Sequence, residues 1–84
     1  MTISATPAIQ RIARVLAAHQ ISRNGEGNLD SASTAVDDLW PDHVDTALAV
    51  LRTLREPSED MSAAGDPAVW ERMVLTAIGE NAPS

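Results

Sequence analysis

Several residue types are missing from this chain of 84 residues, and each absence narrows what it can do. There is no cysteine, which excludes a disulfide framework and a thiolate metal site. Lysine, tyrosine and phenylalanine are also missing, so Trp40 and Trp70 are the only aromatic residues. No apolar run approaches the roughly 20 residues that cross a bilayer, and the N-terminus lacks the basic and apolar segments of a secretory signal. We therefore expect a cytoplasmic protein with no membrane contact.

The length of the chain fits one domain and limits the size of its core. A chain this short buries only roughly 60–65% of the surface that its unfolded form exposes. Small domains often gain stability by oligomerisation, so we expect a simple bundle that is able to form a homodimer. The single helical domain is expected to span residues 7–80, between flexible ends at residues 1–6 and 81–84.

Positive charge is scarce, because six arginines stand against twelve acidic residues and the net charge is −6. A protein that binds a phosphate backbone needs clustered positive charge, so direct nucleic-acid binding is not expected. The charges are unevenly distributed: residues 1–23 carry three arginines and no acid, whereas residues 24–50 carry six acids and no base. Either these are solvated faces, or the first helix docks on the acidic middle, within or between chains.

Three segments have apolar residues at the three- and four-residue spacing of an amphipathic helix. The first runs from about Pro7 to Gln20, the second begins at Pro41, and the third begins at Pro67 with Asp66 as its N-cap. Their apolar stripes contain Ile9, Ile12, Ala13, Leu16 and Ala17; Val44, Ala47, Leu48, Leu51 and Leu54; and Val69, Trp70, Met73, Val74, Ala77 and Ile78. We expect each stripe to be buried against the other helices.

The remaining segments read as connections and short helices. Residues 22–28 are rich in glycine and polar side chains, which predicts a loop, and residues 29–39 suit a short helix capped by Asp30. Pro57 should end the second helix and open a short turn to Ala64, which Gly65 closes in a left-handed conformation. No segment alternates like a strand. The fold class is therefore all-α: a small three-helix bundle with one or two additional short helices, in which sequence neighbours pack roughly antiparallel.

A set of residues across the second half of the chain carries a family resemblance. It consists of Trp40, then Glu56-Pro57-Ser58-Glu59 with Met61, then Ala64-Gly65, and finally Trp70 with Met73. This pattern resembles a group of short helical proteins of alphaproteobacteria and their phages or prophages, over roughly residues 9–79. The chain departs from some members at Ala18-His19-Gln20, where they have cysteine or basic residues. The resemblance implies a helical, phage-derived accessory protein and brings no activity with it.

The ionisable residues do not form a catalytic or metal-binding pattern. Asp42 and Asp45 share a helix face, but His43 points elsewhere, and the other histidine, His19, would have to approach from another helix. The oxygen-bearing side chains from Asn24 to Asp30 lack the glycine and glutamate that a calcium loop requires. No serine lies in a nucleophile elbow. We expect no catalytic residue, no cofactor and no metal, and hence no enzyme.

Four large apolar side chains are the candidates for partner binding: Trp40, Trp70, Met61 and Met73. Tryptophan often anchors interfaces and methionine suits adaptable surfaces, although all four residues could equally cap or fill the core. The sequence favours a small non-enzymatic protein–protein interaction module, acting as a homo-oligomer or an adaptor. The alternative is an acidic decoy that occupies the basic, nucleic-acid-binding surface of a host protein.

Overall fold

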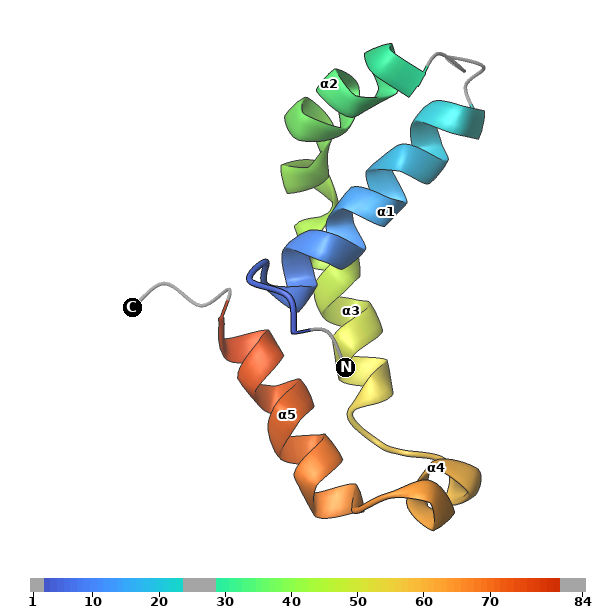
Figure 1. The fold of residues 1–84 in the computed structure, drawn as a ribbon, viewed down its shortest axis with the longest axis vertical. Helices are drawn as coiled ribbons and strands as arrows, with labels where there is room; N and C mark the ends of the chain where they lie inside the picture. The colour runs from blue at the N-terminus through green and yellow to red at the C-terminus, as the bar shows by residue number, and fades with distance from the viewer. Residues whose placement is uncertain (1–2, 24–28, 81–84) are drawn as a thin grey trace.

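A computed structural model describes residues 3–23 and 29–80, with the side chains of residues 29–33 excepted. It contains helices α1 (Ala8–Arg23), α2 (Leu29–Leu39), α3 (Val44–Leu54), α4 (Glu59–Ala64) and α5 (Pro67–Gly79), and a 3₁₀ helix η1 (Trp40–His43) (Figure 1). No strand occurs in the described part of the chain, so the all-α class is confirmed. The loop predicted at residues 22–28 is wrong for Ser22 and Arg23, which continue helix α1. Residues 24–28 of that loop and the predicted tail at 81–84 lie outside the described residues.

Local capping explains where the two C-terminal helices begin. The carboxylate Oδ1 of Asp66 accepts a hydrogen bond from the Ala68 N–H at 2.9 Å, and Pro67 follows at the first helical position, as predicted. The hydroxyl of Ser58 accepts the Met61 N–H at 3.3 Å and caps α4. The chain leaves α3 after Leu54 and resumes helix at Glu59, so the predicted break before Pro57 is also confirmed.

Three local predictions are wrong. Helix α2 begins at Leu29, so Asp30 lies inside the helix and not at its N-cap. Pro41 opens no α-helix, because residues 40–43 first make a tighter 3₁₀ turn. Gly65 has φ −160° and ψ −167°, which is extended backbone and not the left-handed conformation. The α4–α5 connection therefore uses an extended step that any residue can adopt.

Helices α2, η1 and α3 follow one another as one helical segment that bends at η1; helix α1 runs roughly antiparallel to α2 and crosses α3 (Figure 1). No non-helical residue separates α2 from α3, so the expectation that all sequence neighbours fold back on one another is wrong for this pair. The physical reason is that a proline is tolerated in the first turn of a helix, so Pro41 tightens the chain without reversing it. Helix α1 consequently packs on α2, η1 and α3 together.

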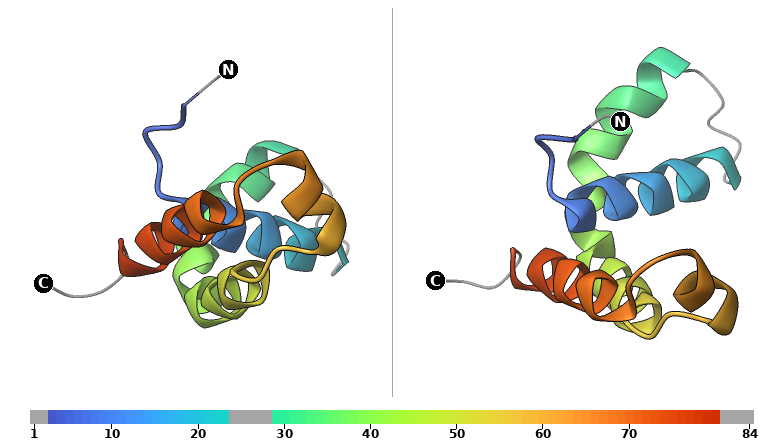
Figure 2. Two further views of the ribbon diagram at one scale, coloured as in Figure 1. Left: turned by 90° about the horizontal axis from the view of Figure 1, so that it is seen from below. Right: turned by 60° about the horizontal axis from the view of Figure 1, so that its bottom comes forward.

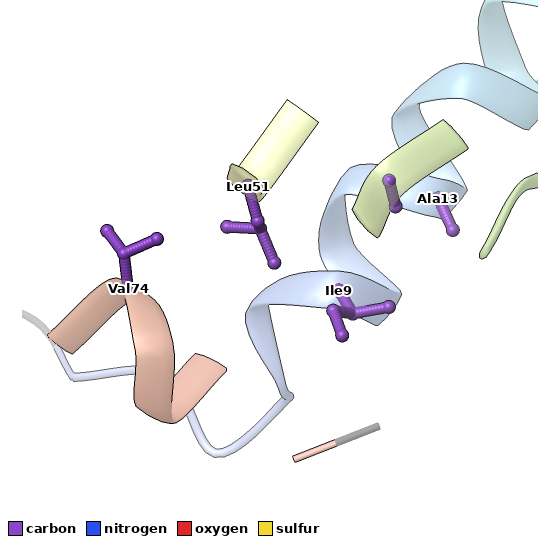
Figure 3. Packing of buried hydrophobic residues seen from close by; sticks show 5 residues of the cluster. Ile9, Ala13, Leu51 and Val74 are labelled. Atoms are coloured by element: carbon purple, nitrogen blue, oxygen red, sulfur yellow. The ribbon is translucent and has the colours of Figure 1, made fainter. Parts of the chain in front are cut away.

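The core consists of two small clusters along α1. The first joins α1, α3 and α5 through Ile9, Ala13, Ala47, Leu51 and Val74, four of which are labelled in Figure 3. The second joins α1 and α2 through Ala17, Ile21 and Val36. Trp40 packs against both clusters and connects them. Three of these eight buried residues are alanines, which lets the helices approach closely but encloses little apolar surface.

Part of the uneven charge of the sequence is paired within the folded chain. Arg14 of α1 forms an ion pair with Asp37 of α2, with 2.7 Å between Nη2 and Oδ1. His43 of η1 also bonds to Gln20 of α1, with 2.7 Å between Nε2 and Oε1. The basic first helix therefore docks on part of the acidic middle of the same chain.

Helix α5 lies at one side of this arrangement. Its main neighbour is α3, and it meets α1 only at a few positions, while α1 separates it from α2 (Figure 2). None of the helices in the described part is both long and apolar enough to cross a membrane. The fold is thus an open bundle with one weakly covered helix.

Candidate functional site

A groove of about 520 Å³ lies between residues 3–7, which we call the N-terminal arm, and the helices α1, α3 and α5. We call it the α5 groove. One wall comes from the arm and the first turn of α1, the other from α5, and Leu51 of α3 lies at the junction. The residues that line it are Ile3, Ser4, Ala5, Thr6, Pro7, Ala8, Arg11, Leu51, Trp70, Met73, Val74, Thr76, Ala77 and Glu80. Its chemistry is mainly apolar, with one basic and one acidic residue.

The helix α5 contributes an apolar flank that the rest of the chain leaves uncovered. Met73 is 64% exposed and Val69 is 38% exposed, although their spacing predicts burial together with Val74. Val74 itself is buried against Leu51 of α3. The prediction for Val69 and Met73 is wrong because α5 packs on α3 almost alone, so only part of its apolar face meets a neighbour. Of the two, Met73 lines the α5 groove and Val69 does not.

Trp70 fixes α5 to the end of α3. Its indole Nε1–H donates a hydrogen bond to the carbonyl oxygen of Leu54 at 2.6 Å. Leu54 is the last residue of α3, where carbonyl groups have no partner within the helix. The ring also packs against the first core cluster. Trp70 therefore covers one side of the core and supplies a hydrogen-bond donor to the last carbonyl of α3.

Trp70 also lines a second, smaller cavity of about 240 Å³. It is formed at the α4–α5 connection by Met61, Pro57 and Pro67, with Ala64, Gly65 and Asp66. Met61 is 38% exposed. The structure therefore brings Trp70 together with Met73 in the α5 groove, and Trp70 together with Met61 in this second cavity.

Trp40 does not belong to this surface in the same way. It is partly buried at the junction of the two core clusters, and it lines a different pocket of about 80 Å³ with Pro7, Ile9, Gln10 and Glu80. Of the four predicted partner-binding residues, Met73 and Trp70 lie on α5 and Met61 lies on α4, around the α5 groove and the second cavity. Trp40 lies on η1, where it packs against both core clusters.

The two histidines come from different elements and line one pocket of about 420 Å³. His19 of α1 and His43 of η1 share it with Leu16, Gln20 and Arg23. Within residues 3–23 and 29–80, no group of three or more histidine or carboxylate side chains converges as a metal site would require. Asp42 and Asp45 are exposed and do not line this pocket.

Sequence reasoning missed the wall of the groove opposite α5. Ile3 and Arg11 both line the groove, yet the sequence predicts a flexible end at residues 1–6 and places Arg11 off the apolar stripe. The Arg11 Nε–H donates to the Thr6 carbonyl at 3.1 Å, which holds the arm beside α1. A lone isoleucine in a polar N-terminal arm is the one signal in the sequence that could have indicated this contact.

Comparison of the chain with protein-family models, with curated proteins and with solved structures finds no match. The resemblance to helical proteins of alphaproteobacteria and their phages therefore stays a prediction. The geometry of the α5 groove is the remaining guide to function.

Proposed function

We propose that this chain is a small non-enzymatic protein–protein interaction module whose binding surface is the α5 groove. The observation that carries the proposal is the exposure of Met73 in a mainly apolar groove, with Val69, also exposed, one helical turn before it on α5. Two exposed apolar side chains one helical turn apart, next to a partly buried tryptophan, have the composition of an interface anchor. Covering them removes apolar surface from water and stabilises the complex.

The two flanks of α5 allow a matched test of this surface. Met73 lines the groove, whereas Leu75, two residues later on the opposite flank and 43% exposed, does not. A photo-reactive amino acid at either position can be activated in the cell that makes the protein, and the crosslinked products identified by mass spectrometry. We expect a crosslink to protein from position 73 and little or none from position 75.

The result is informative whichever protein is captured. A crosslink from position 73 to this chain or to another protein supports a binding surface at the groove. Equal labelling from positions 73 and 75 would mean random collision, and no product from position 73 would contradict the proposal. Far-UV circular dichroism of both variants checks that the helices remain.

The acidic decoy is favoured by a different observation. Asp38, Asp42 and Asp45 are exposed along α2, η1 and α3, close to the Asp37 that pairs with Arg14. A basic partner held by such a surface would dissociate steeply as salt is added, because exposed charges are screened. A partner held in the apolar groove would lose little affinity over the same range of salt.

A further inference from the structure

We infer that the occupant of the α5 groove is a second copy of this chain, related to the first by a two-fold axis, with Met73 of each copy against the groove of the other. This inference rests on the proposed function and names the partner at the same surface. Two observations lead to it: the charge of the groove and the small size of the core.

The charge of the groove selects where two copies can meet. Each copy carries a net charge of −6, so most of its surface repels another copy. The charged residues that line the groove are Arg11 on the α1 side and Glu80 just after α5, so this face is neutral. In a two-fold interface every contact between two different residues occurs twice, once from each copy. Arg11 of each copy can therefore pair with Glu80 of the other.

The core explains why a second copy fits better than an occasional foreign partner. Among the described side chains, eight apolar residues are buried, three of which are alanines, and no large side chain is completely enclosed. A chain of this size with so little core gains stability when a partner covers its apolar surface, and a copy of itself is present whenever the chain is made. Self-association therefore buries apolar surface that the monomer leaves exposed, to an extent that grows with the concentration of the chain.

Sedimentation equilibrium of the full chain from micromolar to millimolar concentration tests the inference. We expect the wild-type mass to rise from 8.9 kDa to twice that value. Met73→Glu places an unpaired carboxylate in the interface, so its dissociation constant should rise about 100-fold or more. Leu75→Glu adds the same charge on the opposite flank of α5 and should dimerise within about threefold of the wild type.

The charge pair gives a second, independent variant set. Arg11→Glu and Glu80→Arg should each weaken the dimer, because they place like charges opposite one another across the two-fold axis. The double variant R11E/E80R should recover most of the affinity. A loss caused only by releasing the N-terminal arm from Arg11 would not be recovered, so rescue separates the interface from that local contact.

A wild-type chain that stays at 8.9 kDa to millimolar concentration would overturn the inference. So would a dimer that Met73→Glu and Leu75→Glu affect equally, or a charge-swapped pair that shows no rescue. If the chain is monomeric while position 73 still crosslinks to a different protein, the second-copy inference is wrong and the proposed function stands. If position 73 crosslinks to nothing, both are wrong.

Discussion

Trp70 is the residue on which the position of α5 depends most. Its ring contributes apolar contact with the first core cluster, and its N–H satisfies the Leu54 carbonyl at the end of α3. A tryptophan performs both tasks because its large apolar body carries a single donor at one edge. Trp40 contributes contact with both clusters, and its ring makes no hydrogen bond to another described residue.

Replacing Trp70 by phenylalanine should therefore cost more than the same change at Trp40. Trp70→Phe leaves the Leu54 carbonyl without its donor, which lowers the free energy of unfolding by about 1 kcal/mol beyond the loss of ring area. Urea denaturation followed by circular dichroism measures the difference between Trp70→Phe and Trp40→Phe. If Trp40→Phe is the more destabilising of the two, the hydrogen bond does not hold α5 in place.

Gly65 gives a prediction of opposite sign. Its extended backbone suits any residue, and an added Cβ would meet nothing within 4 Å. Gly65→Ala should raise the free energy of unfolding by about 0.4–1 kcal/mol, because alanine restricts the unfolded chain more than glycine does. Thermal unfolding of the variant checks this. A clear loss of stability would show that residue 65 needs the left-handed conformation after all.

At the scale of elements, α4 and α5 have similar caps but different surroundings. Helix α5 packs on α3 and contributes Val74 to the core, whereas none of the residues of α4 is buried. A cap stabilises the whole fold only when the helix it opens takes part in cooperative packing. The two caps should therefore differ in their effect on global stability.

Asp66→Ala removes the cap of α5 and should lower the free energy of unfolding by about 1 kcal/mol. Ser58→Ala removes the cap of α4 and should leave global stability within about 0.5 kcal/mol of the wild type. Hydrogen exchange at Met61 should accelerate in Ser58→Ala, because its N–H loses that partner. Equal global losses from both variants would place α4 in the cooperative unit.

The helices were readable from the sequence, but their mutual arrangement was not. Apolar spacing and the caps near Pro57 and Pro67 are local signals, and they predict the end of α3 and the positions of α4 and α5 closely, whereas α3 begins at Val44 and not at Pro41. The continuous run from α2 to α3 was missed, because nothing local decides whether Pro41 turns the chain or only tightens it. The α5 groove was missed for the same reason: exposure of Met73 depends on how far α1 reaches toward α5.

At the scale of the whole molecule, the open arrangement and the interaction surface are the same feature. Helix α1 packs along the α2–η1–α3 segment, but it meets α5 at only a few positions, and Met73 stays exposed in the α5 groove. The chain therefore folds with part of its predicted core facing outward, and a second copy would complete it.

Oxidation of the methionines by dilute peroxide, followed by mass spectrometry, tests this most directly. Met73 is 64% exposed and Met61 38% exposed within one chain, so Met61, which lies outside the groove, serves as an internal reference. In dilute solution Met73 should react faster than Met61, and at high concentration its rate should fall below that of Met61. If Met73 remains the faster of the two at every concentration, no second copy covers the groove.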